Sequence, residues 1–162
     1  TELGEFAENT VLFEAACSND PILRLAGVNR ALEGLAIDVF TQMKEFGDVA
    51  GDPFLEFCED WMLADEVTHV KMGSDWLRKV TANDPDRRTK ALEFQQVVDK
   101  LFSFGGARGE SPESSFSLAK RFRELAGFTD DEVETISQMD AEALEELKEA
   151  VRKYRERVGA DV

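Results

Sequence analysis

The sequence predicts an all-α fold in which two long antiparallel helices form half of a four-helix bundle and further helices follow. Apolar residues recur at helical spacing along the chain, and no run shows the alternation of a β-strand. Asp-Pro pairs at 20–21, 52–53 and 84–85, and a Ser-Pro pair at 111–112, mark helix starts. This follows because Asp or Ser caps the first amide groups of a helix and proline suits its first turn.

The first of these helices is expected from Pro21 to about Phe46, where Gly47 would end it. A shorter helical stripe precedes it, within residues 3–17. The next helix is expected from Pro53 to about Thr81, a span of roughly 42 Å at 1.5 Å per residue. Because only a short loop joins these two long helices, we expect them to pack side by side in opposite directions.

The second half of the chain predicts shorter helices. The Gly-rich stretch 105–109 is interpreted as a linker, because no strand precedes it and no Lys-Ser/Thr follows it. We expect residues 1–82 to carry the functional site and residues 83–162 to form a helical extension packed on it. The expected helices run from Pro85 to Phe104, from Pro112 to Ala126 before Gly127, from Thr129 for a short stretch, and from Asp140 to Val158.

Composition limits the classes of function. With 34 acidic and 19 basic residues the net charge is −15, which argues against a clamp on nucleic acid. The basic side chains between residues 85 and 126, Arg123 among them, are expected on solvated helix faces. No apolar run approaches the roughly 20 residues of a membrane helix, and the acidic residues 1–14 do not show a signal-peptide pattern. Two cysteines make no disulfide framework, so we expect a cytoplasmic protein without a membrane partner.

The candidate site is built around the single histidine, His69, which follows Glu66 by three residues and therefore shares its helix face. That face is mostly apolar, and an unpaired charge there would cost several kcal/mol. Gly73, one turn further on, leaves room beside the histidine. On the preceding helix Glu33 lies in the middle of the apolar stripe, where a surface helix would not place a carboxylate. The structural alternatives for this acid are pairing with Arg30 or capping by a neighbouring residue.

Glu33, Glu66 and His69 together have the chemistry of metal ligands. Carboxylates neutralise and bridge hard cations, whereas an imidazole completes one ion and leaves positions open for oxygen. In a complete di-metal carboxylate site, two helices each give a Glu and two others each give Glu-x-x-His, so this sequence holds one half. Asp65, next to Glu66, is expected to accept the remaining N–H of the histidine.

Three segments, residues 23–48, 54–79 and 117–133, carry a family resemblance. The second contains Asp-Glu-Val-Thr-His-Val-Lys-Met-Gly, and the third contains Arg-Glu-Leu-Ala-Gly-Phe. Over about residues 9–137 the chain resembles an uncharacterised bacterial family of ferritin-like domain proteins, near the di-iron tRNA hydroxylases and ferritin-like oxidases. The resemblance implies a ferritin-like bundle in which Glu33, Glu66 and His69 bind iron, with two ions in a complete site and manganese or a mixed pair as alternatives. It also implies oxidoreductase or oxygenase chemistry on an unidentified small molecule.

The sequence departs from that family in lacking a second histidine. Members carry an earlier helix pair with its own Glu and Glu-x-x-His. The site is therefore expected to be completed in a homodimer, or by N-terminal helices of the same protein that this sequence lacks; the third alternative is an incomplete metal site. Glu8 and Glu14 could substitute only in part. The competing functional hypothesis is a non-enzymatic helical interaction module, in which Glu66 and His69 form a buried hydrogen-bonded pair.

Overall fold

The computed structural model describes residues 16–104 and 118–139, and the single residues 142, 145 and 149. Within this part of the chain all regular structure is helical and no strand forms, which confirms the all-α prediction. The expectations for residues 1–15, 105–117 and most of 140–162 lie outside the described residues. The elements are α2 (Pro21–Arg24), η1 (Leu25–Leu32), α3 (Glu33–Ala50), α4 (Pro53–Val80), α5 (Pro85–Phe104) and α6 (Lys120–Leu125), and residues 130–139 are also helical.

The three helix starts predicted at Asp-Pro pairs are confirmed by their capping hydrogen bonds, whereas the helix expected from Pro112 is described as α6 from Lys120 only, after the non-helical residues 118–119. Asp20 accepts the backbone N–H of Ile22 at 2.9 Å, and Asp52 accepts the amides at the start of α4. Asp84 accepts the backbone N–H of Arg87 at 2.9 Å, three residues further on. Each carboxylate satisfies amide groups that have no partner within the helix, and this fixes where the element begins.

The segment from α2 to α3 is one continuous helical stretch that differs from the prediction in two ways. It ends at Ala50 rather than near Phe46, because Gly51, with φ of 68°, adopts the left-handed conformation that terminates helices. Gly47 instead stays inside the helix, and a Cβ added there would lie 2.7 Å from the backbone nitrogen of Glu56. The second difference is that η1 is a π-helix, a rare form often associated with functional sites.

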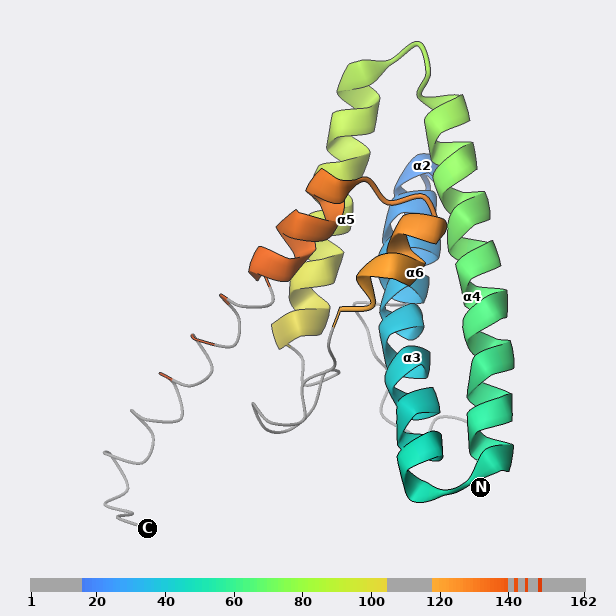
Figure 1. Ribbon diagram of the computed structural model, residues 1–162. Helices are drawn as coiled ribbons and strands as arrows, with labels where there is room; N and C mark the ends of the chain where they lie inside the picture. Colours follow the sequence, from blue (N-terminus) through green and yellow to red (C-terminus); the bar gives the residue numbers. More distant parts are fainter. Residues whose placement is uncertain (1–15, 105–117, 140–141, 143–144, 146–148, 150–162) are drawn as a thin grey trace, which may run out of the picture.

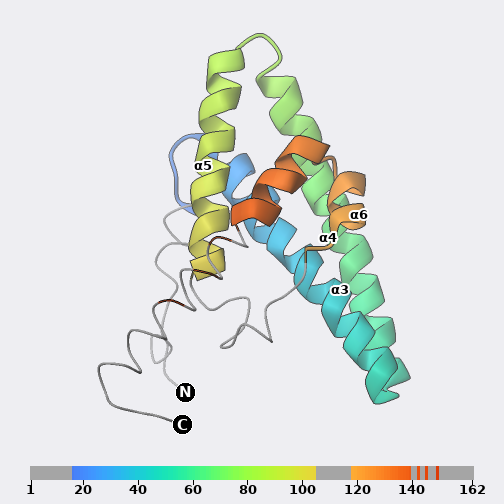
Figure 2. The same cartoon turned by 60° about the vertical axis from the view of Figure 1, so that its left-hand side comes forward.

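Helices α3 and α4 lie side by side and run in opposite directions, as both views show (Figures 1 and 2). Helix α5 packs against η1 (Figure 2). Residues 118–139 cover the α3–α4 pair, so that the main core forms between these three parts of the chain. Its buried members are Ile37, Leu63, Val70, Ala126, Phe128, Val133 and Ile136. The division into residues 1–82 and 83–162 stays a prediction.

A buried ion pair ties the C-terminal segment to α3. The side chains of Asp38 and Arg123 are both 0% exposed, and Arg123 Nη2 donates to Asp38 Oδ2 at 2.6 Å. Asp38 also accepts the backbone N–H of Ala119 at 2.8 Å. The expectation that Arg123 lies on a solvated face is therefore wrong. Its charge is compensated by an acid 85 residues earlier in the chain, which the local sequence pattern does not reveal.

Arg30 is the second buried cation, and it joins η1 to three other parts of the chain. Its guanidinium donates to Gln95 on α5, Ser74 on α4 and Glu132 near the C-terminus, at 2.8, 3.0 and 2.6 Å. The same group lies 4.4 Å from the ring centre of Phe128. Burial lowers the pKa of Arg30, and the negative charge of Glu132 opposes that shift. The alternative that Arg30 pairs with the candidate ligand on α3 is therefore wrong.

In the residues that the structure describes, no helix combines the length and apolar composition required to span a bilayer.

Candidate metal centre

The structure brings the three candidate ligands Glu33, Glu66 and His69 to one place. Glu33 is the first residue of α3, directly after the π-helical stretch, and the other two lie one turn apart near the middle of α4. One ligand atom from each residue lies within 4.8 Å of the other two. The cluster forms because α3 and α4 are adjacent along their length, so that residues 33 positions apart in the chain meet across the helix pair.

The imidazole of His69 lies between two carboxylates. Its Nδ1 is 3.6 Å from Oε2 of Glu66, and its Nε2 is 3.7 Å from Oδ1 of Asp65. Both distances exceed those of hydrogen bonds. The His69 side chain is 43% exposed, so the buried hydrogen-bonded Glu–His pair of the interaction-module hypothesis is not formed. The arrangement leaves one ring nitrogen directed to the cluster and the other to Asp65.

Glu66 carries the least satisfied polar group of the cluster. Its Oε2 is buried and accepts no hydrogen bond from the described residues. Burial raises the pKa of Glu66, the neighbouring carboxylate of Glu33 raises it further, and the imidazole of His69 partly offsets both effects. A buried carboxylate oxygen without a donor is costly in a folded protein, and a cation beside it would remove that cost.

Asn29 caps Glu33, which agrees with the alternative that a neighbouring residue satisfies this acid, although the sequence did not single out Asn29. Its Nδ2 donates to Glu33 Oε2 at 3.0 Å across one helical turn. Asn29 can lie there because α4 presents Gly73 to it; a Cβ on Gly73 would come within 2.6 Å of the Asn29 Cβ. The space that Gly73 leaves is thus filled by the close approach of η1 and not left open beside His69. The four-residue spacing between Asn29 and Glu33 was the signal that could have revealed this role.

Two further acids were candidates for this cluster. Glu8 and Glu14 lie outside the described residues.

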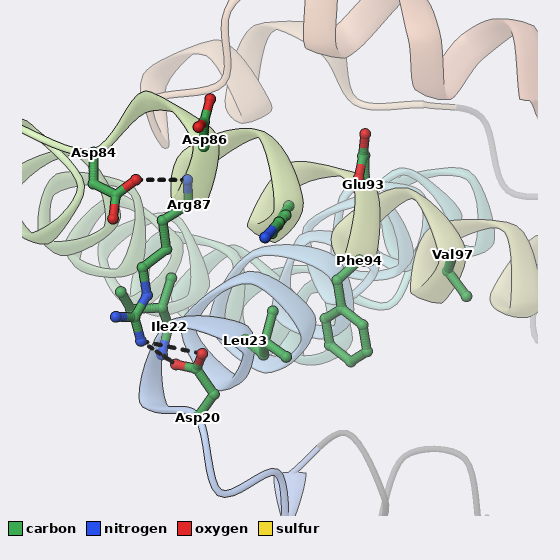
Figure 3. Close-up of a pocket in the computed structure, with 10 residues that line it drawn as sticks. Asp20, Ile22, Leu23, Asp84, Asp86, Arg87, Glu93, Phe94 and Val97 are labelled. Carbon is green, nitrogen blue, oxygen red and sulfur yellow. Dashed lines mark hydrogen bonds and ion pairs between the residues drawn. The ribbon is translucent and has the colours of Figure 1, made fainter.

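A pocket of about 590 Å³ opens between α2 and α5, where Arg87 reaches both carboxylate oxygens of Asp20 at 3.1 Å (Figure 3). Phe94 and Val97 contribute apolar surface to this pocket. None of the three candidate ligands lines it, so it is a separate feature of the molecule.

The comparisons with known proteins give one match. Residues 1–134 match the model of a family described as "Protein of unknown function (DUF455)". No curated protein and no solved structure matches the chain.

Proposed function

We propose that this chain, which belongs to the DUF455 family, is a metal-binding protein whose residues Glu33, Glu66 and His69 hold a transition-metal ion. The observation that carries the proposal is the convergence of these three side chains from two different helices, one of which, Glu66, has a buried carboxylate oxygen that accepts no hydrogen bond from the described residues. Spacing in the sequence could not establish that convergence, since Glu33 lies on a different helix from the other two.

The geometry and the donor set fit a metal ion. Metal bonds of about 2.0–2.2 Å hold two ligand atoms at most about 4.4 Å apart. Ligand atoms already within 4.8 Å of one another need only small side-chain rotations to reach that arrangement. The hydrogen bond from Asn29 holds one oxygen of Glu33 and leaves the other for the ion.

Two carboxylates and one imidazole suit a divalent transition metal, and iron is our proposal. Such a set neutralises the charge of the ion and leaves coordination positions open, and bound iron would supply redox chemistry with oxygen or a small molecule. Within this chain, Glu33 and Glu66 would bind the ion and His69 would complete the set. Asp65 would accept the second imidazole N–H and thereby orient the ring.

The test is metal content after purification under air and after anaerobic reconstitution with ferrous iron. We expect iron to be retained by the wild type and lost in His69→Ala and in Glu33→Ala. Glu59→Gln is the matched control, since Glu59 is also a buried acid on α4 with an oxygen that lacks a donor. It lies seven residues from Glu66, or about 10 Å along the helix.

Two results would refute the proposal. One is a folded wild type that holds no iron, manganese or zinc after reconstitution. The other is retention of the metal in His69→Ala, because binding would then occur elsewhere in the protein. Either result would favour the interaction-module hypothesis, for which the exposed apolar side chains of α4 are the supporting observation.

A further inference from the structure

Helix α4 exposes a stripe of large apolar side chains along its outer face, within the part of the chain that the structure describes. Its most exposed members, Phe54, Phe57 and Trp61, are 75%, 62% and 67% exposed. Most successive members lie three or four residues apart, and Met72 follows Met62 by ten residues, so the members share one side of the helix. The α4 stripe, as we call it, consists of Phe54, Phe57, Trp61, Met62, Met72, Trp76 and Val80. Two apolar patches on one side of a helix, separated by a short polar centre, mark an interaction surface.

The α4 stripe is arranged symmetrically about the metal cluster. Trp61 and Met72 lie at equal distances along the chain from the midpoint between Glu66 and Val67. The same midpoint relates Phe57 to Trp76, and it relates Phe54 to Val80 to within one residue. Consider two copies of α4 that run in opposite directions and cross at this midpoint. On each side of the midpoint, an apolar side chain of one copy would then face an apolar side chain of the other at three successive positions along the helices.

The charges of α4 favour the same antiparallel arrangement. The half from 53 to 66 carries five acidic residues and no basic one. The half from 67 to 80 carries three basic residues and one acidic one. An antiparallel pair sets the acidic half of each helix beside the basic half of the other, whereas a parallel pair would set like charges together.

We propose that this chain forms a two-fold homodimer through antiparallel pairing of the α4 stripes, centred between Glu66 and Val67. A two-fold axis pairs each surface with its own copy, which is what a face with this internal symmetry can satisfy. The centre of the contact is polar and small, with Ala64, Asp65 and Thr68 between the two apolar halves, so the helices can approach closely there.

The dimer also explains the position of the metal cluster. Along α4, Glu66 and His69 lie near the midpoint of the stripe. Around the helix axis, they lie on one side of the stripe, between it and α3. A two-fold axis across the pair keeps the same flank of both helices on the same side. It therefore places the clusters of the two copies next to each other, and together they would supply four carboxylates and two imidazoles. This joint site rests on the proposed function, whereas the dimer itself rests only on the α4 stripe.

The oligomeric state tests the dimer. By light scattering at micromolar concentration we expect the wild type at twice the chain mass of 18.1 kDa. Trp61→Glu should weaken association at least about 100-fold, because each substitution occurs twice in a two-fold contact and removes a central aromatic side chain. Leu125→Glu is the control, since Leu125 on α6 is 56% exposed and lies off the stripe.

Cross-linking tests the direction and register without disturbing the apolar contacts. In a chain whose Cys17 and Cys58 are replaced by serine, Thr68→Cys should cross-link to itself through a short thiol-specific reagent, because residue 68 lies near the axis. Val80→Cys should not, since its two copies would be about 40 Å apart along the helices. A parallel pair would cross-link both.

His69→Ala separates the two proposals. We expect it to lose the metal and to remain dimeric. A monomeric wild type, unaffected association in Trp61→Glu, or efficient cross-linking of Val80→Cys would overturn the α4 dimer, and none of these results bears on whether the cluster binds metal.

Discussion

At the scale of single residues, the cluster contains a carboxyl group whose ionisation is unfavourable in the folded protein. Glu66 is held partly buried beside the carboxylate of Glu33, and both burial and that neighbour raise its pKa. A raised carboxyl pKa means that the folded protein prefers the protonated form, so its ionisation opposes folding as the pH rises above the ordinary pKa of the group. A glutamate whose ionisation opposes folding is better explained by a role in binding a ligand than by a contribution to stability.

We therefore predict that Glu66→Gln stabilises the metal-free protein at neutral pH and abolishes metal binding. The amide has the same shape as the carboxyl group and carries no charge, so the gain is expected at about 0.5–2 kcal/mol. Chemical unfolding of the metal-free proteins measures it. The gain should shrink as the pH falls toward the ordinary pKa of a glutamate, because wild-type Glu66 is then protonated as well. Glu45→Gln, on the exposed surface of α3, should change stability little at any pH.

The neighbouring residue Asp65 has a different expected role. Its carboxylate lies 3.7 Å from Nε2 of His69 and is 60% exposed, so it contributes little to folding. We predict that Asp65→Asn keeps the unfolding free energy and weakens metal affinity about 10- to 100-fold, because the imidazole loses the acceptor that orients it. Competition with a chelator measures the affinity. An unchanged affinity would assign Asp65 to the solvent-exposed surface alone.

At the scale of elements, the close contact between η1 and α4 couples packing to the cluster. Gly73 lets the backbone of α4 approach Asn29, and Asn29 holds Glu33 by its side-chain amide. A side chain at position 73 would meet the Cβ atom of Asn29, which is fixed to the backbone of η1. Turning a flexible side chain therefore cannot make room for a larger residue at position 73. Separation of η1 and α4 would move Glu33 away from the two ligands on α4.

Gly73→Ala is accordingly expected to destabilise the protein by about 1–3 kcal/mol and to weaken metal binding. Without the contact, alanine would stabilise a helix interior, so the sign of the change is informative. Gly47→Ala is the matched control. It creates a contact of 2.7 Å with the backbone of Glu56 at the far end of the same helix pair. It should cost similar stability but leave the metal affinity unchanged, as thermal unfolding and a chelator titration would show.

At the scale of the whole molecule, buried ion pairs attach the C-terminal segment to the helix pair. Arg123 meets Asp38 on α3, and Arg30 meets Glu132, so two cations from distant parts of the chain are enclosed together with their acids. Removing one member of such a pair leaves the other charge buried, which is far more costly than losing an exposed pair.

Arg123→Ala is expected to lower the unfolding free energy by about 3–5 kcal/mol, because Asp38 would be left without its main compensating charge. The double variant Asp38→Leu/Arg123→Met should recover most of that loss, since neither charge remains. Lys44→Ala breaks the exposed pair with Asp60 and should cost about 1 kcal/mol or less. Urea unfolding of the four proteins gives the comparison. Equal losses in Arg123→Ala and Lys44→Ala would contradict this account.

The sequence by itself determined the all-α class and the helix starts at the three Asp-Pro pairs, and it identified the candidate ligands, because these depend on short-range physics. An Asp cap, a proline in the first turn and a three-residue Glu–His spacing act within one or two turns of the chain. Only the tertiary structure decided the rest. The π-helical stretch before Glu33 and the approach of Asn29 to Gly73 arise from packing between helices. The partners of the buried cations lie 85 and 102 residues away, beyond any local pattern, because burial of a charge is settled by whichever distant element can compensate it.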